Sequence, residues 1–233
     1  KYEERRLQEE AATQAAADGP VPLFVMALLF PGERMALNIF EPRYRLMVRR
    51  CMEGSHCFGM AASDPSTGEL LPVACEVEIV ECQSLPDGRY GLEVVGRRRF
   101  RIESEWQQDG YRMVQPEYFA DSPLPPESPD HAELQAMAEQ AANTAEGVLS
   151  QARSRLRNQP EEFRPVYAIL ARIGQRPRAD DVEALSFWAA ALCFPSSDRE
   201  RVKILEQTNT SERIKRVNEL LSQGVSGQRC VVQ

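Results

Sequence analysis

The chain has 233 residues, of which 42% are hydrophobic, and its 35 acidic and 28 basic side chains give a net charge of −7. This length and apolar content predict a folded domain with its own core. The acidic balance disfavours nucleic acid as a partner, because phosphates bind surfaces of positive potential. No apolar run approaches the roughly 20 residues of a membrane-spanning helix, and the first residues, KYEERRLQEE, are too charged for a secretory signal. We therefore expect a cytoplasmic protein and, since the chain begins with Lys1 rather than Met, a part of a longer one.

A charged leader comes first and a β-rich pattern follows it. Residues 1–19 are rich in Glu, Arg, Gln and Ala and predict a helical linker. The nearly continuous apolar run Val21–Leu29 then predicts a buried strand. The turn sequence Phe30-Pro31-Gly32-Glu33 ends that run, and the alternation of Met35–Phe40 predicts a second strand that pairs with the first in a hairpin.

A helix is predicted directly after the second strand. Pro42 lacks an N–H that the first helical turn leaves unbonded in any case, and Glu41 places an acid near the positive end of the helix. Gly54 is expected to end the helix in the left-handed conformation. Helical spacing predicts one apolar face that packs on the sheet, formed by Tyr44, Met47, Val48 and Cys51.

The sequence up to residue 120 continues to read as strands and turns. Alternation places Phe100 inward, so Arg99 and Arg101 are expected on the solvent side of their strand. Further strands are predicted over Phe58–Ala62, Val73–Leu85, Arg89–Val95, Arg99–Glu103 and Tyr111–Tyr118.

A proline-rich segment over residues 121–130 ends the β-rich part, because each proline disfavours a helical conformation in the residue before it. Residues 131–223 then have helical periodicity and are expected to form a helical subdomain, with a flexible tail over residues 224–233. Helices are predicted over residues 132–156, 161–173 and 180–193, and N-caps of two more at Ser197 and Asn209, each three residues before a Glu.

Three stretches of the chain resemble one family. Residues 22–60 resemble the amino-terminal substrate-binding domain of Lon proteases, most closely the version in RING-finger ubiquitin ligases, through PLFVMALLFPG and FEPRYRLMVRRCMEGSHCFGM. The family's central hairpin is similar to SLPDGRYGLEVVGRRRFRI, and its closing helices are similar to LSFWAAALCFPSSDRERVKILEQTNTSERIKRVNELL. The resemblance implies an α+β fold, with a PUA-like pseudobarrel of the Lon N-terminal type over residues 20–120 and a helical bundle over residues 131–223.

The sequence contains no pattern of a catalytic or cofactor site. A Gly-x-x-x-x-Gly-Lys phosphate loop and a Gly-x-Ser-x-Gly elbow are both absent, and His56 and His131 lie in predicted loops without a nucleophile partner. The six cysteines include no Cys-x-x-Cys pair, so neither a zinc site nor another cofactor is expected, and Cys51 and Cys75 fit buried free thiols. We therefore expect a chain that binds rather than one that catalyses.

Two features indicate where partners bind. Phe30, Pro31 and Trp106 lie at predicted strand ends or loops, where exposed apolar groups mark partner surfaces, with burial in the core as the alternative for each. Trp188, in an apolar helix, is expected in the core. The final residues, Cys230-Val231-Val232-Gln233, match the C-a-a-X pattern for prenylation. Cys230 is therefore a candidate lipid attachment site and the membrane a partner only through that lipid, with a chance match as the alternative.

Two functions remain open at this point. The resemblance implies recognition of protein or peptide substrates within a RING-type ubiquitin ligase, whose RING domain upstream of Lys1 engages an E2 enzyme. The alternative is a free-standing Lon-like adaptor, tethered to a membrane when prenylated. A cysteine-rich sequence upstream of Lys1 would distinguish the first from the second.

Overall fold

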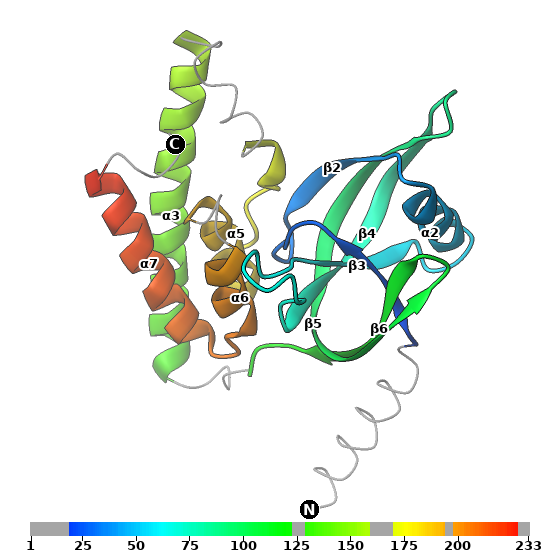
Figure 1. Ribbon diagram of the computed structural model, residues 1–233. Coiled ribbons are helices and arrows are strands. Elements are labelled where there is room, and N and C mark those ends of the chain that lie inside the picture. The colour runs from blue at the N-terminus through cyan, green and yellow to red at the C-terminus, as the bar shows by residue number, and fades with distance from the viewer. Residues whose placement is uncertain (1–18, 123–128, 159–169, 194–197, 228–233) are drawn as a thin grey trace, which may run out of the picture.

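The computed structural model describes residues 19–122, 129–158, 170–193 and 198–227. The strands and one short helix form one part of the molecule, and the remaining helices form a second part beside it (Figure 1). The predicted α+β class, a β-rich part followed by a helical one, is therefore confirmed. Four predicted features lie outside the described residues, namely the leader helix, most of the helix over residues 161–173, the cap at Ser197 and the part of the tail from residue 228 onward, with Cys230. Residues 224–227, predicted as flexible tail, are helical.

The elements follow one another in two blocks. The β-rich block contains β1 (Val21–Val25), β2 (Arg34–Ile39), α2 (Pro42–Met52), β3 (Cys57–Ala61), β4 (Val73–Ser84), β5 (Tyr90–Gln108) and β6 (Tyr111–Phe119). The helical block contains α3 (Pro129–Asn158), α5 (Val182–Cys193), α6 (Asp198–Glu206) and α7 (Thr210–Gly227).

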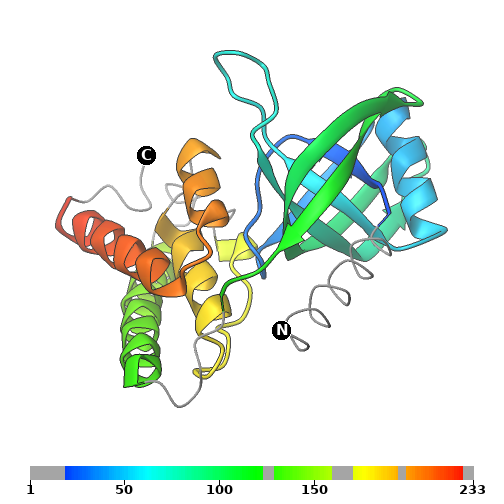
Figure 2. The same ribbon diagram turned by 90° about the horizontal axis from the view of Figure 1, so that it is seen from below.

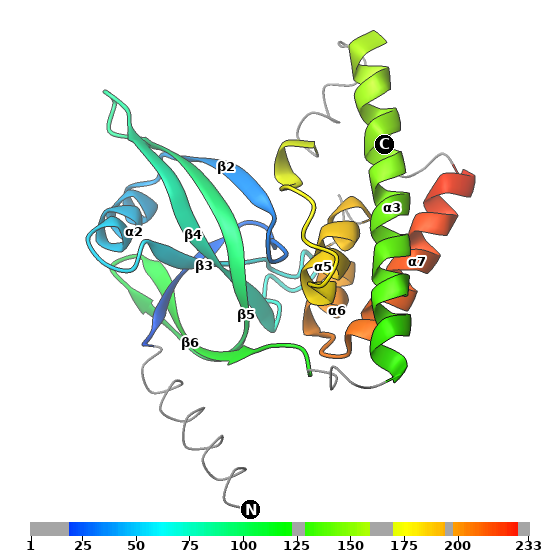
Figure 3. The same cartoon turned by 180° about the vertical axis from the view of Figure 1, so that it is seen from behind.

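The strands curve into a barrel. Their order is β2-β5-β4-β3-β1-β6, and β6 also pairs with β5, which closes the circuit (Figures 2 and 3). The 19-residue β5 makes this closure, because its first half pairs with β4 and its second half with β6. β1 and β3 run parallel, and the other pairs are antiparallel. Among the described residues β2 pairs with β5 alone, so it is an edge strand outside the closed circuit.

The apolar run at the start of the barrel is only partly a strand. β1 ends at Val25, and Leu28, Leu29 and Phe30 follow as irregular chain whose side chains are fully buried. β1 pairs with β3 and β6, so the predicted hairpin between the first two strands is wrong. The run stays apolar beyond Val25 because Leu28 and Phe30 leave the sheet and pack in the same core cluster as the helices.

The helix α2 begins at Pro42 and lies against the barrel. Its predicted apolar face is confirmed, since Tyr44, Met47, Val48 and Cys51 are all buried. The ring of Tyr44 meets that of Phe24 edge to face, with centroids 4.5 Å apart. The predicted left-handed conformation of Gly54 is wrong. His56 has the positive φ instead, at 59°.

The two strands predicted on either side of residues 96–98 are one continuous strand, β5. Gly96 keeps that strand unbroken where another segment comes very close, because a Cβ at this position would lie 2.2 Å from the carbonyl oxygen of Phe30. The N–H of Gly96 donates to the carbonyl of Glu33 at 2.8 Å, which joins β5 to the chain entering β2.

The helical block is a bundle in which α3, α5 and α7 all pack against one another. Every residue of α5 from Leu185 to Leu192 is buried, and α3 meets the bundle through a run of fully buried alanines that includes Ala138 and Ala142. The predicted cap at Asn209 is confirmed, because its Oδ1 accepts the N–H of Glu212 at 3.2 Å. Within the described ranges, no helix combines the length and the apolar character that crossing a bilayer requires.

Candidate functional site

The barrel and the helical bundle meet at a junction that is held by buried side chains. Phe30 of the barrel part and Phe187 of α5 lie with ring centroids 5.8 Å apart. The same core cluster includes Leu28, Val73 and Cys75 from the barrel side together with the apolar side chains of α3, α5 and α7. The two parts therefore share one continuous core.

One buried ion pair ties the start of β2 to α6. The guanidinium of Arg201 pairs with the carboxylate of Glu33, and both side chains are only 3% exposed. Arg201 Nε also donates to the carbonyl of Leu28 at 3.1 Å, and its guanidinium lies 4.1 Å from the ring centre of Phe30. Burial lowers the pKa of Arg201, but the adjacent Glu33 charge and the hydrogen bonds favour its charged form. These contacts fix the irregular segment that precedes β2 against the bundle.

A second buried cluster ties β5 to α7. Arg99, which the alternation placed on the solvent side, is 2% exposed, so that prediction is wrong, whereas Arg101 is exposed as expected. Arg99 Nη2 donates to Asp121 at 2.6 Å and to Glu183 at 2.8 Å, and Nη1 donates to the carbonyls of Leu205 and Gln207 at 2.8 and 3.0 Å. A guanidinium with this many acceptors tolerates burial that an unpaired charge would not.

Asp121 is the centre of this second cluster. Its carboxylate also accepts from Arg213, which is 1% exposed, and from Thr210. Burial alone would raise the pKa of Asp121, but the hydrogen bonds and charge of Arg213, with Thr210 and Arg99, hold it below its ordinary value. Burial, together with the nearby Asp121 charge, raises the pKa of Glu183.

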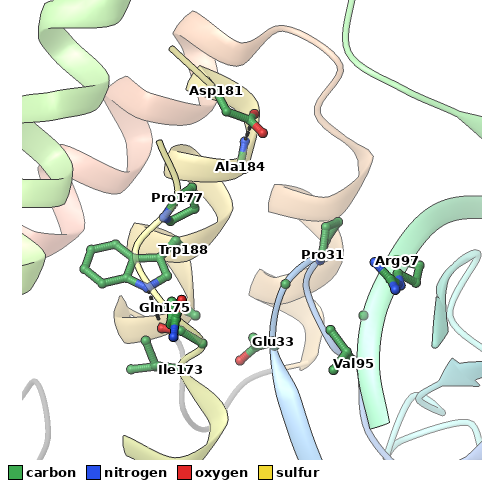
Figure 4. A pocket seen from close by; sticks show the side chains of 14 residues that line it. Pro31, Glu33, Val95, Arg97, Ile173, Gln175, Pro177, Asp181, Ala184 and Trp188 are labelled. Carbon is green, nitrogen blue, oxygen red and sulfur yellow. Dashed lines mark hydrogen bonds between the residues drawn. The ribbon is translucent and has the colours of Figure 1, made fainter. Parts of the chain in front are cut away.

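A cleft of about 360 Å³ lies at the same junction and is mostly apolar. Figure 4 shows its two walls, one from the bundle side with Ile173, Pro177 and Trp188 and one from the barrel side with Pro31, Glu33 and Val95. We call this space the junction cleft; its lining is Pro31, Gly32, Glu33, Val95, Gly96, Arg97, Ile173, Gly174, Gln175, Pro177, Asp181, Ala184, Trp188 and Ala191.

The walls of the junction cleft are fixed by hydrogen bonds. Trp188 Nε1 donates to the carbonyl of Gly174 at 3.0 Å, which orients the indole and holds the loop before α5. Asp181 Oδ1 accepts the N–H of Ala184 at 3.0 Å and caps α5. Glu33 also accepts the N–H of Phe30 at 2.7 Å. These hydrogen bonds hold side chains of both cleft walls in place.

The junction cleft has a mostly apolar lining. Its ionisable lining residues are all engaged: Glu33 with Arg201, Arg97 with Glu78, and Asp181 with the cap of α5. Among the described residues, no group of three His, Cys, Asp or Glu side chains lies close enough to hold a metal ion. The arrangement offers apolar contact area to an apolar group of a ligand.

A second hollow lies along β2, near the junction cleft. It has a volume of about 520 Å³ and lies between β2 and the helical residues 170–172 that precede Ile173. We call it the β2 groove; its lining is Arg34, Met35, Ala36, Glu93, Ala171 and Arg172. The two hollows adjoin, since residues 33 and 34 on one side, and 172 and 173 on the other, are consecutive along the chain.

The structure separates the residues that the sequence singled out for partner binding. Phe30 is fully buried, so it is not on a surface, and the physical reason is its place between Phe187 and Arg201 in the shared core. Pro31 is partly exposed and lines the junction cleft. Trp106 is 39% exposed near the end of β5, opposite Met113 of β6, and does not line the cleft. Its partner-binding role stays a prediction, as does the attachment of a lipid at Cys230, which lies outside the described residues.

Sequence reasoning missed the bundle wall of the junction cleft. Trp188 was expected in the core, and it is 8% exposed, yet its indole also faces the cleft. The signal that could have identified this wall is Gly174 with Pro177 just before α5, since a loop rich in glycine and proline beside an apolar helix often frames a binding site.

Comparisons with known proteins agree on one family. A family model described as the ATP-dependent protease La (LON) substrate-binding domain matches residues 20–223. A Lon protease of Cytophaga hutchinsonii is 25% identical over 93 residues, which cover 37% of this chain and 11% of that protein. A LON peptidase N-terminal domain and RING finger protein of Schizosaccharomyces pombe is 31% identical over 122 residues, which cover 45% of this chain and 25% of that protein. The chain thus matches a quarter or less of the length of these relatives.

Solved structures share the fold. The Lon N-terminal domain protein from Xanthomonas campestris superposes with a TM-score of 0.58 at 20% identity, over 87% of this chain and 98% of that one. The N-terminal domain of a Mycobacterium avium complex Lon protease gives a TM-score of 0.56 at 15% identity, over 88% and 98%. At these identities the likeness shows that the barrel and the bundle together form the Lon N-terminal fold.

Proposed function

We propose that this chain, which belongs to the Lon substrate-binding domain family, recognises protein substrates by taking their apolar side chains into the junction cleft. The observation that carries this proposal is the composition of the cleft: apolar walls that are already fixed, with its ionisable lining side chains engaged in other contacts. A preformed apolar cavity binds apolar groups without a large ordering cost. Unfolded proteins expose such groups and folded ones bury them, so the expected substrates are unfolded or damaged polypeptides.

Binding of an unfolded protein tests this proposal. The probe is ribonuclease A that has been reduced, carboxymethylated and labelled with fluorescein, and native ribonuclease A with the same label is the control. We expect the fluorescence anisotropy of the unfolded probe to rise on titration with the chain, and that of the native probe to stay constant. Ala184→Phe places a ring in the cleft and should weaken binding at least tenfold. Absence of binding by the unmodified chain would overturn the proposal.

The cleft also supplies its own spectroscopic reporter. The chain has two tryptophans, so Trp106→Phe leaves Trp188 in the cleft wall as the sole indole. Ribonuclease A contains no tryptophan, and its unfolded form should therefore change the emission of Trp188 when it binds. An unchanged emission during a rise in anisotropy would place the binding site elsewhere.

We further propose that the chain is the recognition part of a RING-type ubiquitin ligase, with the RING domain upstream of Lys1. The supporting observation is the match to the RING finger protein of Schizosaccharomyces pombe, together with the sequence resemblance described above. The reading frame upstream of Lys1 tests it. A cysteine-rich RING sequence there, and ubiquitin transfer from an E2 enzyme by the whole protein, would support the ligase. Their absence would favour the free-standing adaptor.

A lipid at Cys230 is a separate proposal, and it rests on the C-a-a-X pattern of the last four residues. Farnesylation would add a single chain and give weak, reversible membrane attachment. The intact mass of the protein isolated from eukaryotic cells tests it, with Cys230→Ser as the matched control. An unmodified mass would remove the membrane as a partner.

A further inference from the structure

The backbone of β2 has one side paired and one side open. β2 pairs with β5 over six consecutive residues without a register shift. In an antiparallel pair, the N–H and C=O of alternate residues point to opposite sides of the strand. One half of the backbone groups of β2 is therefore directed at β5 and the other half at the open edge.

Two hydrogen bonds decide which residues face the open edge. Leu85 directly follows β4 and Arg89 directly precedes β5, and the N–H of Leu85 donates to the carbonyl of Arg89 at 2.9 Å. The backbone groups of Arg89, and of every second residue after it in β5, therefore face β4. The backbone groups of the intervening residues of β5 face β2, and the hydrogen bond from the N–H of Gly96 to the carbonyl of Glu33 agrees with this assignment. By the register of the pair, the residues of β2 that face β5 are Met35, Leu37 and Ile39, and those that face outward are Arg34, Ala36 and Asn38.

The outward-facing residues have no strand partner among the described residues, and all three are exposed. Proteins protect an edge of this kind with lysine, proline, a bulge or a covering element, because unpaired backbone groups attract another strand. Among the described residues, β2 has no lysine, proline or bulge; it has the charge of Arg34, which is paired with Glu93, and residues 170–172 lie across the β2 groove from it. The edge is thus a regular row of donors and acceptors with little protection.

The surroundings of this edge suit a peptide chain. The β2 groove lies beside it, with Met35, Ala36 and Ala171 as apolar lining. Directly after the strand comes Phe40, which is 63% exposed and has the largest exposed fraction of the exposed large apolar side chains in the described chain. An added strand would place its backbone on the edge and its apolar side chains against these surfaces.

We propose that the open edge of β2 binds an extended segment of an unfolded client polypeptide as an additional strand of the sheet. Only a peptide backbone offers donors and acceptors at the spacing of Arg34, Ala36 and Asn38, and backbone pairing selects extended shape rather than a particular sequence. The apolar lining and Phe40 add a preference for apolar side chains at alternate positions of the client. The segment would lead from the edge into the adjoining junction cleft. This inference rests on the proposed recognition of unfolded proteins and specifies how the backbone of the client is held.

Amide hydrogen exchange, measured on the isotopically labelled chain, tests the inference residue by residue. The probe is unfolded, carboxymethylated ribonuclease A at saturating concentration. We expect the amides of Arg34, Ala36 and Asn38 to exchange at least tenfold more slowly with the probe than without it, while those of Leu37 and Ile39 are protected in both states by β5. Binding of the probe with no change at the three outward amides would overturn the inference and leave the proposed function standing. Failure of the probe to bind would overturn both.

A pair of matched variants gives an independent measure. Phe40→Ala removes the exposed ring at the end of β2, and Met26→Ala removes another exposed apolar side chain, 50% exposed, that follows β1 instead. Neither side chain is buried, so both variants should fold. We expect Phe40→Ala to weaken probe binding about tenfold, in the range of interface hot spots, and Met26→Ala to leave it within twofold. Equal effects of the two variants would count against a site at the β2 edge.

Discussion

Arg201→Met is expected to destabilise the chain strongly, because it leaves the carboxylate of Glu33 buried without its partner. Methionine replaces much of the volume of the arginine stem, but it removes the guanidinium that lies over Phe30 and donates to the carbonyl of Leu28. Breaking a buried ion pair by removing one member costs about 3–5 kcal/mol. Arg172 Nη2 remains 3.6 Å from Glu33 Oε1 and partly compensates, so we expect about 3 kcal/mol, the lower end of that range.

Urea unfolding followed by circular dichroism measures this effect. With a dependence on urea of about 3 kcal/mol per molar, the midpoint should fall by about 1 M. Arg199→Met is the matched control, since Arg199 is on the same helix but is exposed and pairs with Asp64 at the surface. Its midpoint should stay within experimental error.

The double variant Glu33→Gln with Arg201→Met separates charge from packing. Glutamine can still accept the N–H of Phe30 but carries no charge, so the double variant should recover more than half of the loss. A single variant within about 1 kcal/mol of the unmodified chain, or a double variant no more stable than Arg201→Met, would refute the account of Glu33 as a buried charge held by Arg201.

Three further predictions follow from buried groups at the junction. Gly96→Ala should lower the melting temperature by about 6 °C, equivalent to about 2 kcal/mol, because its Cβ would collide with the carbonyl of Phe30, whereas Gly91→Ala, with open space around it, should have little effect. Cys75 should resist thiol reagents at pH 8 in the folded chain and react on unfolding, since burial raises the pKa of its thiol to about 12. Its contribution to stability is complete below the ordinary thiol pKa of 9.0 and declines as the pH rises toward 12. Asp121 should stabilise the fold above its ordinary pKa of 3.8, and this contribution should disappear as the pH falls through the lower pKa of the folded state, so urea midpoints below pH 4 should converge with those of Asp121→Asn.

The parts of the fold that the sequence predicted correctly depend on neighbours in the chain. The start of α2 follows from Pro42, its buried face follows from helical spacing, and the cap of α7 follows from Asn209 three residues before Glu212. Each of these signals acts over one or two turns of chain, so no knowledge of distant residues is needed.

The errors concern partners that are far away in sequence. Alternation placed Arg99 toward solvent because its neighbour Phe100 points inward, and nothing local reveals that Asp121 and the carbonyls of Leu205 and Gln207 converge on Arg99. The pairing of β2 with β5 rather than β1 likewise depends on residues that are 51 to 61 positions apart, from Ile39 with Tyr90 to Arg34 with Val95. The junction cleft has the same origin, since its walls come from residues 31–33, 95–97 and 173–191.

The two arginine clusters and the open edge of β2 lead to different behaviour on binding. Arg201 and Arg99 join the barrel to the bundle, and the junction cleft is complete only while that junction holds. The edge of β2 belongs to the barrel sheet, and its pairing groups are set by β5 alone. Loosening the junction with Arg201→Met should therefore reduce capture of apolar side chains in the cleft while the outward amides of β2 still become protected by the probe. If capture in the cleft and protection of the β2 amides were lost equally, the cleft and the edge would act as one site whose geometry depends on the ion pair between Glu33 and Arg201.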